Sequence, residues 1–139
     1  MDRLHAYCYF LEGLIPMLHR PECTTVYIEG IDSISLLLKQ IAPEFVRSDV
    51  YAQLLRARIY GAAILPIDAS AASAESEALA AFQAFSDDPR VNGGFLFGRR
   101  DGTLSPHVNP VSTVFAVQAL EIWSRYDAES NPPCLPILI

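Results

Sequence analysis

Apolar positions recur at helical spacing along most of this chain, and proline, glycine or runs of small residues separate the periodic segments. The pattern predicts five helices joined by short connections. Pro16 is expected to end or kink the first helix, and Pro43 to stop the second. The predicted helices cover residues 3–14 or 3–18, 22–41, 48–63, 75–85 and 111–125.

The glycine-rich stretch before the last helix predicts the only local β-structure. Asn-Gly-Gly breaks any helix that arrives from upstream, and Phe-Leu-Phe follows it. An Asp-Gly pair then lies between two short apolar runs, which is a hairpin signal. We therefore predict a small two-stranded ribbon near 95–105, with a charged tip formed by Arg99, Arg100 and Asp101.

The start of the last helix is the best-defined helix boundary in the sequence. Asn109 is a favourable N-cap, and Pro110 suits the first helical position. The helix that follows is apolar nearly all round, which predicts burial on more than one side. The helices over 48–63 and 75–85 are more amphipathic, and Arg56 and Arg58 are expected to be solvated or paired at the surface.

These elements predict an all-α fold of antiparallel helical hairpins with one small β-hairpin. The 139 residues suffice for one domain with a real core, which we assign to residues 1–126. The remaining residues, 127–139, form a proline-rich tail with an apolar end. The tail is expected to pack on the surface or on a partner.

The composition of the chain indicates which kinds of partner and which cellular compartment to expect. The net charge of −6 argues against a nucleic-acid partner, which needs a basic face. The sequence has no run of 18 or more apolar residues, so it predicts no membrane-spanning helix. The first residues lack the basic start of a signal peptide. We therefore expect a cytoplasmic protein that does not interact with membranes.

The cysteines favour reduced, structural thiols over a metal site. The three cysteines, Cys8, Cys23 and Cys134, are widely spaced and form no Cys-x-x-Cys pair. Zinc held by these thiols with a histidine stays an open alternative, but no pair has a recognised ligand spacing. We expect no metal and no other cofactor.

The first helix carries a polar-tipped strip beside its apolar side. His5, Tyr9 and Glu12 follow one another at i, i+4 and i+7. One interpretation is a satisfied hydrogen-bond network between packed helices. The other is a strip that faces a ligand, with Tyr9 as a stacking platform and Glu12 as an acid, a base or a hydroxyl acceptor. A carboxylate among apolar residues needs a partner or a raised pKa.

Two stretches resemble a known superfamily. The opening HAYCYFLEGL and the later GGFLFGRRDG and NPVSTVFAVQALEIW resemble the helical hairpins of α/α-toroid proteins. They are most similar to six-hairpin glycosidase-like proteins, and more distantly to terpenoid cyclases and prenyltransferase β subunits. A hairpin takes roughly 35–50 residues, so the chain has room for only part of a toroid. The resemblance implies carbohydrate-related ancestry, in a fragment, a subunit or a chain that oligomerises.

This resemblance implies a saccharide ligand and a set of candidate residues. Glycoside hydrolysis usually needs two carboxylates, for which Glu12 and Asp101 are the catalytic candidates. Two other functions stay open, a non-catalytic helical interaction module and an isoprenoid-binding toroid, and so does the question of whether the chain is an enzyme. The candidate substrate-binding residues are His5, Tyr9, Tyr27, Glu29, Arg99, His107 and Asn109.

Overall fold

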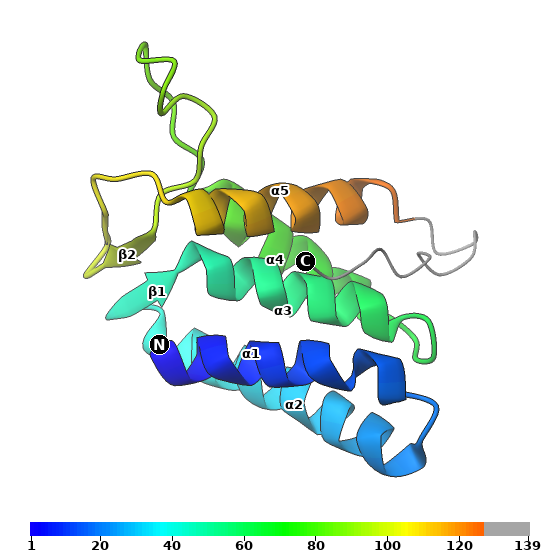
Figure 1. Cartoon of the computed structure of the whole chain (residues 1–139). Coiled ribbons are helices and arrows are strands. Elements are labelled where there is room, and N and C mark those ends of the chain that lie inside the picture. Colours follow the sequence, from blue (N-terminus) through cyan, green and yellow to red (C-terminus); the bar gives the residue numbers. More distant parts are fainter. Residues whose placement is uncertain (127–139) are drawn as a thin grey trace.

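The computed structural model describes residues 1–126 and is mostly helical with one small sheet, as the hydrophobic pattern predicts (Figure 1). The tail predicted at 127–139 lies outside the described residues. The elements in chain order are α1 (Asp2–Leu14), the short 3-10 turn η1 (Ile15–Met17), α2 (Pro21–Ile41), β1 (Phe45–Arg47), α3 (Ser48–Gly61), α4 (Ala69–Ala80), β2 (Gly98–Arg100), β3 (Thr103–Leu104) and α5 (Pro110–Ser124).

The helices run alternately away from the sheet and back towards it. In Figure 1, α1, α3 and α5 all start at the sheet and run away from it, while α2 and α4 return. Helix α3 lies at the centre, with α1 and α2 on one side and α4 and α5 on the other. The chain therefore forms two antiparallel pairs, α1–α2 and α3–α4, to which α5 adds on the outside.

Helix α3 is buried on all sides, which the sequence did not predict. Every one of its residues except Tyr51 is buried. The expectation that Arg56 and Arg58 lie at the surface is wrong, because they are only 2% and 9% exposed. Neighbours surround this helix, so even its polar positions are covered. The amphipathic pattern predicted one buried face only.

Helix α5 begins where its sequence predicts. The Asn109 side chain accepts a hydrogen bond from the Ser112 N–H at 2.9 Å, and Pro110 is the first helical residue. The prediction that this helix is buried on more than one side is wrong, however, because its buried residues share one face. Val111, Val114 and Val117 are all more than half exposed, because α5 packs mainly against α3 and lies at the edge of the bundle.

The hairpin is confirmed, with a third strand added to it. Strands β2 and β3 pair in antiparallel register, and positive φ angles of 48° and 79° place Asp101 and Gly102 in the tight turn between them. Arg99 and Arg100 lie in β2 itself rather than at the tip. Strand β1 pairs with the other edge of β2. It was missed because three residues are too few to show an alternating pattern.

Helix α4 lies earlier in the chain than predicted. The Asp68 side chain accepts a hydrogen bond from the Ala71 N–H at 2.9 Å and starts the helix there, over small residues that the sequence suggested as a loop. The helix ends at Ala80, so Phe82 and Phe85 lie beyond it and do not share one apolar helical face as predicted. Phe82 is buried at 1% exposure, whereas Phe85 is 85% exposed.

Candidate functional site

The most unusual feature of the described core is a group of polar side chains at the packing surface between α1, α3 and α5. Residues 49, 53 and 56 lie at i, i+4 and i+7, which places them on one face of α3. The predicted strip on α1 lies against this face. We call the group the polar seam. It consists of His5, Tyr9 and Glu12 on α1 and Asp49, Gln53 and Arg56 on α3, and we include Ser112, which is buried where α5 packs against α3.

The end of the seam nearest the sheet is a chain of charges. Arg47 holds the Asp49 carboxylate through its Nε at 3.0 Å, and its Nη1 reaches Asp2 at 2.9 Å. Asp49 is almost fully buried in the first turn of α3, where the helix dipole favours a negative charge. The Nδ1 of His5 lies 3.7 Å from Oδ2 of this carboxylate, which is too far for a hydrogen bond, and Nη2 of Arg47 binds the same oxygen.

The other end of the seam is a loose ion pair. Oε1 of Glu12 lies 3.5 Å from Nη2 of Arg56, and both side chains are at least nine-tenths buried. The Arg56 guanidinium also lies over the Phe115 ring, 5.1 Å from its centroid. An exposed ion pair at this distance would contribute little, but here neither group can turn to bulk water.

The middle of the seam has almost no internal hydrogen bonds. Within the described residues, seven buried side-chain nitrogen and oxygen atoms lack a hydrogen-bond partner, and all seven belong to seam residues. A buried polar group without a partner costs about 1–3 kcal/mol, and native proteins contain few of them. The atoms are Nδ1 of His5, Oε1 of Glu12, Nε2 and Oε1 of Gln53, Nε and Nη1 of Arg56, and Oγ of Ser112.

An aromatic side chain covers the outer edge of the seam. Tyr9 is about half exposed, and its ring meets those of His5 and Phe115 edge-on, at centroid distances of 4.8 and 6.2 Å. Burial raises the pKa of Tyr9, and the negative charges of Glu12 and Asp49 raise it further. The phenol therefore stays neutral near pH 7 and can both donate and accept a hydrogen bond.

The structure brings three of the predicted site residues together and separates the others. His5, Tyr9 and Glu12 share the seam. Asp2 contacts the sheet through Arg47, and Glu12 lies ten residues further along α1, about 15 Å from that end. Asp101 lies in the hairpin turn beyond β1, where its N–H donates to the Glu44 carbonyl. The two predicted catalytic carboxylates are therefore not neighbours.

The remaining predicted binding residues have local structural roles or lie elsewhere. The hydroxyl of Tyr27 donates to the Ala57 carbonyl at 2.7 Å inside the α2–α3 contact. Glu29 is exposed on α2. Arg99 lies over the Phe82 ring, and His107 stacks on Phe97. Asn109 caps α5, as described above.

Four seam residues were not among the sequence candidates: Asp49, Gln53, Arg56 and Ser112. The signal for three of them is their spacing, which places an acid, an amide and a guanidinium on one helical face. That face would be solvated on an ordinary surface helix, so only the burial of α3 makes it unusual.

Across residues 1–126, no three His, Cys, Asp or Glu side chains are grouped so that they could bind a metal ion. No helix in this range has the length and apolar character that crossing a membrane requires. Cys8 and Cys23 are free thiols, and burial raises the pKa of Cys8 far above its usual range, so this thiol is unreactive.

The burial of Glu12 should make the free energy of unfolding depend on pH. Burial raises the pKa of Glu12, and the charge of Arg56 and the polar side chain of Gln53 nearby oppose the shift without cancelling it. The folded chain therefore holds this proton more tightly than the unfolded chain, whose glutamate pKa is about 4.3. Stability contributed by protonated Glu12 is lost as pH rises from that value through the raised folded pKa.

We expect the free energy of unfolding of a Glu12→Gln variant to fall less over this pH range than that of the natural chain. Urea denaturation at a series of pH values measures the difference. Glu29→Gln, on the exposed part of α2, is the matched control and should follow the natural chain. Equal pH slopes for Glu12→Gln and the natural chain would show that Glu12 titrates as an ordinary carboxyl group.

Comparison with known proteins does not extend this description. No protein-family model, no curated protein and no solved structure matches the chain.

Proposed function

We propose that the chain is a saccharide-binding helical domain and that the polar seam is its binding site. The observation that carries the proposal is the concentration of buried, unpartnered donors and acceptors in the seam. A saccharide presents hydroxyl groups that each donate and accept hydrogen bonds. Glu12 supplies an acceptor, Arg56 supplies donors, and Gln53 supplies both.

The aromatic side chains of the seam support the same ligand class. Sugar rings present apolar C–H faces that pack on aromatic rings, and Tyr9 and Phe115 line the outer side of the seam. Tyr9 is half exposed. We propose that its side chain moves aside when a sugar hydroxyl binds Gln53 or Arg56. Binding then replaces missing hydrogen bonds in a site that water reaches poorly.

The proposal is for binding without hydrolysis. Hydrolysis of a glycosidic bond uses two carboxyl groups about 5–9.5 Å apart across the bond. Glu12 has no such partner in Asp101, which lies at the other end of α1. The Arg56 guanidinium lies 3.5 Å from the Glu12 carboxylate, and a positive neighbour suits a hydroxyl acceptor better than a general acid.

Gln53 offers the sharpest test, because its amide contributes two of the unpartnered atoms. Gln53→Met keeps the shape of the side chain and removes both polar atoms. We expect the free energy of unfolding to rise by about 1–3 kcal/mol and saccharide binding to be lost. Isothermal titration of a panel of neutral mono- and disaccharides measures the binding, and urea denaturation measures the stability.

The matched control is Gln40→Met on the exposed side of α2, which should change neither quantity. A Gln53→Met variant that binds a saccharide as well as the natural chain would refute the proposed site. A natural chain that binds no member of the panel would refute the ligand class.

The second candidate function is an interaction module within a larger toroid. The two antiparallel pairs α1–α2 and α3–α4 are compatible with a partial α/α toroid. The exposed valines of α5 give it an apolar outer face, which favours a second copy of the chain as the partner. Light scattering on the intact protein distinguishes the two cases: a dimer or larger ring favours this function, and a monomer counts against it.

A further inference from the structure

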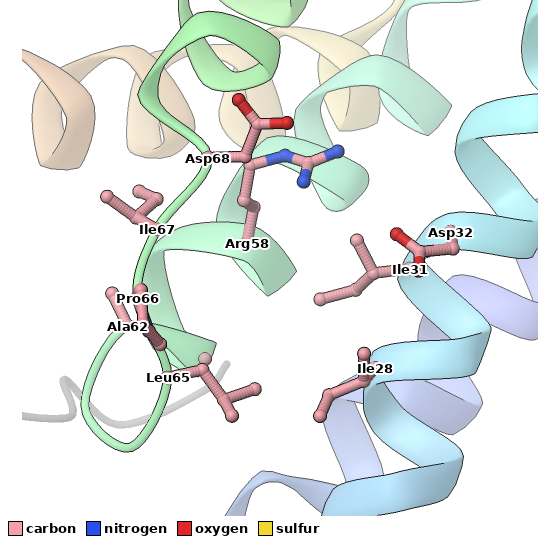
Figure 2. A pocket seen from close by; sticks show the side chains of 10 residues that line it. Ile28, Ile31, Asp32, Arg58, Ala62, Leu65, Pro66, Ile67 and Asp68 are labelled. Atoms are coloured by element: carbon pink, nitrogen blue, oxygen red, sulfur yellow. The ribbon is translucent and has the colours of Figure 1, made fainter.

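A second site lies on the opposite side of α3 from the polar seam, between α2 and the loop that connects α3 to α4. It is a cavity of about 340 Å³, large enough for a small ligand. Figure 2 shows aliphatic side chains of α2 facing those of the loop, with charged groups gathered at one end. The aliphatic lining is Ile28, Ile31, Leu65, Pro66 and Ile67, and the charged lining is Asp32, Arg58 and Asp68.

Only part of the hydrogen-bonding capacity of the Arg58 guanidinium is satisfied within the protein. Its Nε and Nη2 donate to the two carboxylate oxygens of Glu75 at 3.0 and 2.6 Å. Within the described residues its third nitrogen, Nη1, makes no hydrogen bond and is not among the fully buried atoms, so solvent or a ligand can reach it. In Figure 2 the guanidinium extends towards the open space between Asp68 and Asp32. Nη1 is therefore a donor that a ligand can use.

The charged end of the cavity is acidic overall. Glu75 pairs with Arg58, and the exposed Asp32 and Asp68 add two carboxylates that act on Arg58 only at longer range. Neither carboxylate lies within 4 Å of a cationic group in the described residues. Asp68 uses one oxygen, Oδ1, to cap α4, and its other oxygen is available. A cation is the complementary charge.

We infer that this cavity binds an aliphatic primary amine that carries a carbonyl group, the chemistry of a peptide N-terminus that begins with an aliphatic residue. The ammonium group lies between Asp32 and Asp68. The carbonyl oxygen accepts a hydrogen bond from Nη1 of Arg58. The aliphatic side chain packs between Ile28 and Leu65, and a free carboxylate is disfavoured by the two aspartates.

A neighbouring cavity gives a peptide room to continue. It measures about 260 Å³ and shares Asp32, Arg58 and Asp68 with the first. Its lining extends along α2 to Lys39 and along α4 to Ala71. A second peptide residue can follow this direction, whereas a free amino-acid amide fills only the first cavity.

The test titrates leucinamide and a short peptide that begins with leucine into the intact isotope-labelled protein. We expect both to shift the backbone amide signals of Asp32, Asp68 and Ile31, and not those of the polar seam. N-acetyl-leucinamide removes the positive charge and should bind at least about tenfold more weakly. Binding of the peptide but not of leucinamide would show that the continued chain is required, and still supports the inference.

Two variants locate the ammonium group. Asp32→Asn, at an exposed position on α2, and Asp68→Asn, which keeps a residue that caps helices well, should each weaken leucinamide binding about tenfold. Asp87→Asn, on the exposed loop after α4, is the control and should bind normally. Equal binding of N-acetyl-leucinamide, unchanged affinity in both variants, or no binding of either amine would overturn the inference.

Discussion

An Arg58→Met variant is expected to lose about 3–5 kcal/mol of its free energy of unfolding. Arg58 and Glu75 form a two-point ion pair at 2.6 and 3.0 Å, and both side chains are less than one-tenth exposed. Burial and the hydrogen bonds to Arg58 act in opposite directions on the pKa of Glu75, and burial prevails, so its pKa is raised. Removing the guanidinium leaves that carboxylate buried without its partner. Urea denaturation at pH 7 measures the loss.

Two controls separate the broken pair from a general effect of the substitution. The double variant Arg58→Met/Glu75→Leu removes both charges and should recover most of the stability, since an apolar pair of similar volume tolerates the same site. Arg125→Met removes an exposed i,i+4 pair with Glu121 and should change stability by no more than about 0.5 kcal/mol. A double variant as unstable as Arg58→Met would show that packing rather than charge explains the loss.

Phe82→Ala is expected to cost about 3–5 kcal/mol. The Phe82 ring is buried directly after α4, where it contacts Tyr51 of α3 and lies under the guanidinium of Arg99 in β2. Its carbonyl also accepts a hydrogen bond from the Leu96 N–H at 2.9 Å. This ring therefore links α3, α4 and the sheet, and its loss leaves a cavity where the three meet.

Phe85 provides a matched control only three residues away. Its ring is almost fully exposed, so Phe85→Ala should change the free energy of unfolding by no more than about 0.5 kcal/mol. Thermal and urea denaturation of the two variants compare them directly. Similar losses at both positions would mean that α4 continues past Ala80, as the sequence pattern alone predicts.

Local sequence signals predicted where helices and turns occur better than they predicted which residues are buried. Caps and turns depend on a few neighbouring residues, so Asn109-Pro110 and Asp101-Gly102 identified the start of α5 and the hairpin correctly. The start of α4 at Asp68 was missed because the small residues that follow it show no apolar helical period.

Burial depends on packing partners, which the hydrophobic pattern does not name. The apolar α5 lies at the edge with exposed valines, whereas the more polar α3 occupies the centre. For the same reason the strip of His5, Tyr9 and Glu12 was found from its spacing, but its partners on α3 were not. Arg56 looked like a surface residue because its two covering helices are distant in sequence.

The NMR signals of the arginine side chains test most directly whether the polar seam is the ligand site. The Nε–H signals of the arginine side chains are recorded on the intact labelled protein, with and without the panel of neutral saccharides. Nε of Arg56 lacks a partner, whereas Nε of Arg58 is bonded to Glu75. A saccharide is expected to move the Arg56 signal and to leave the Arg58 signal in place. An Arg56 signal that no saccharide moves would contradict the proposed ligand site.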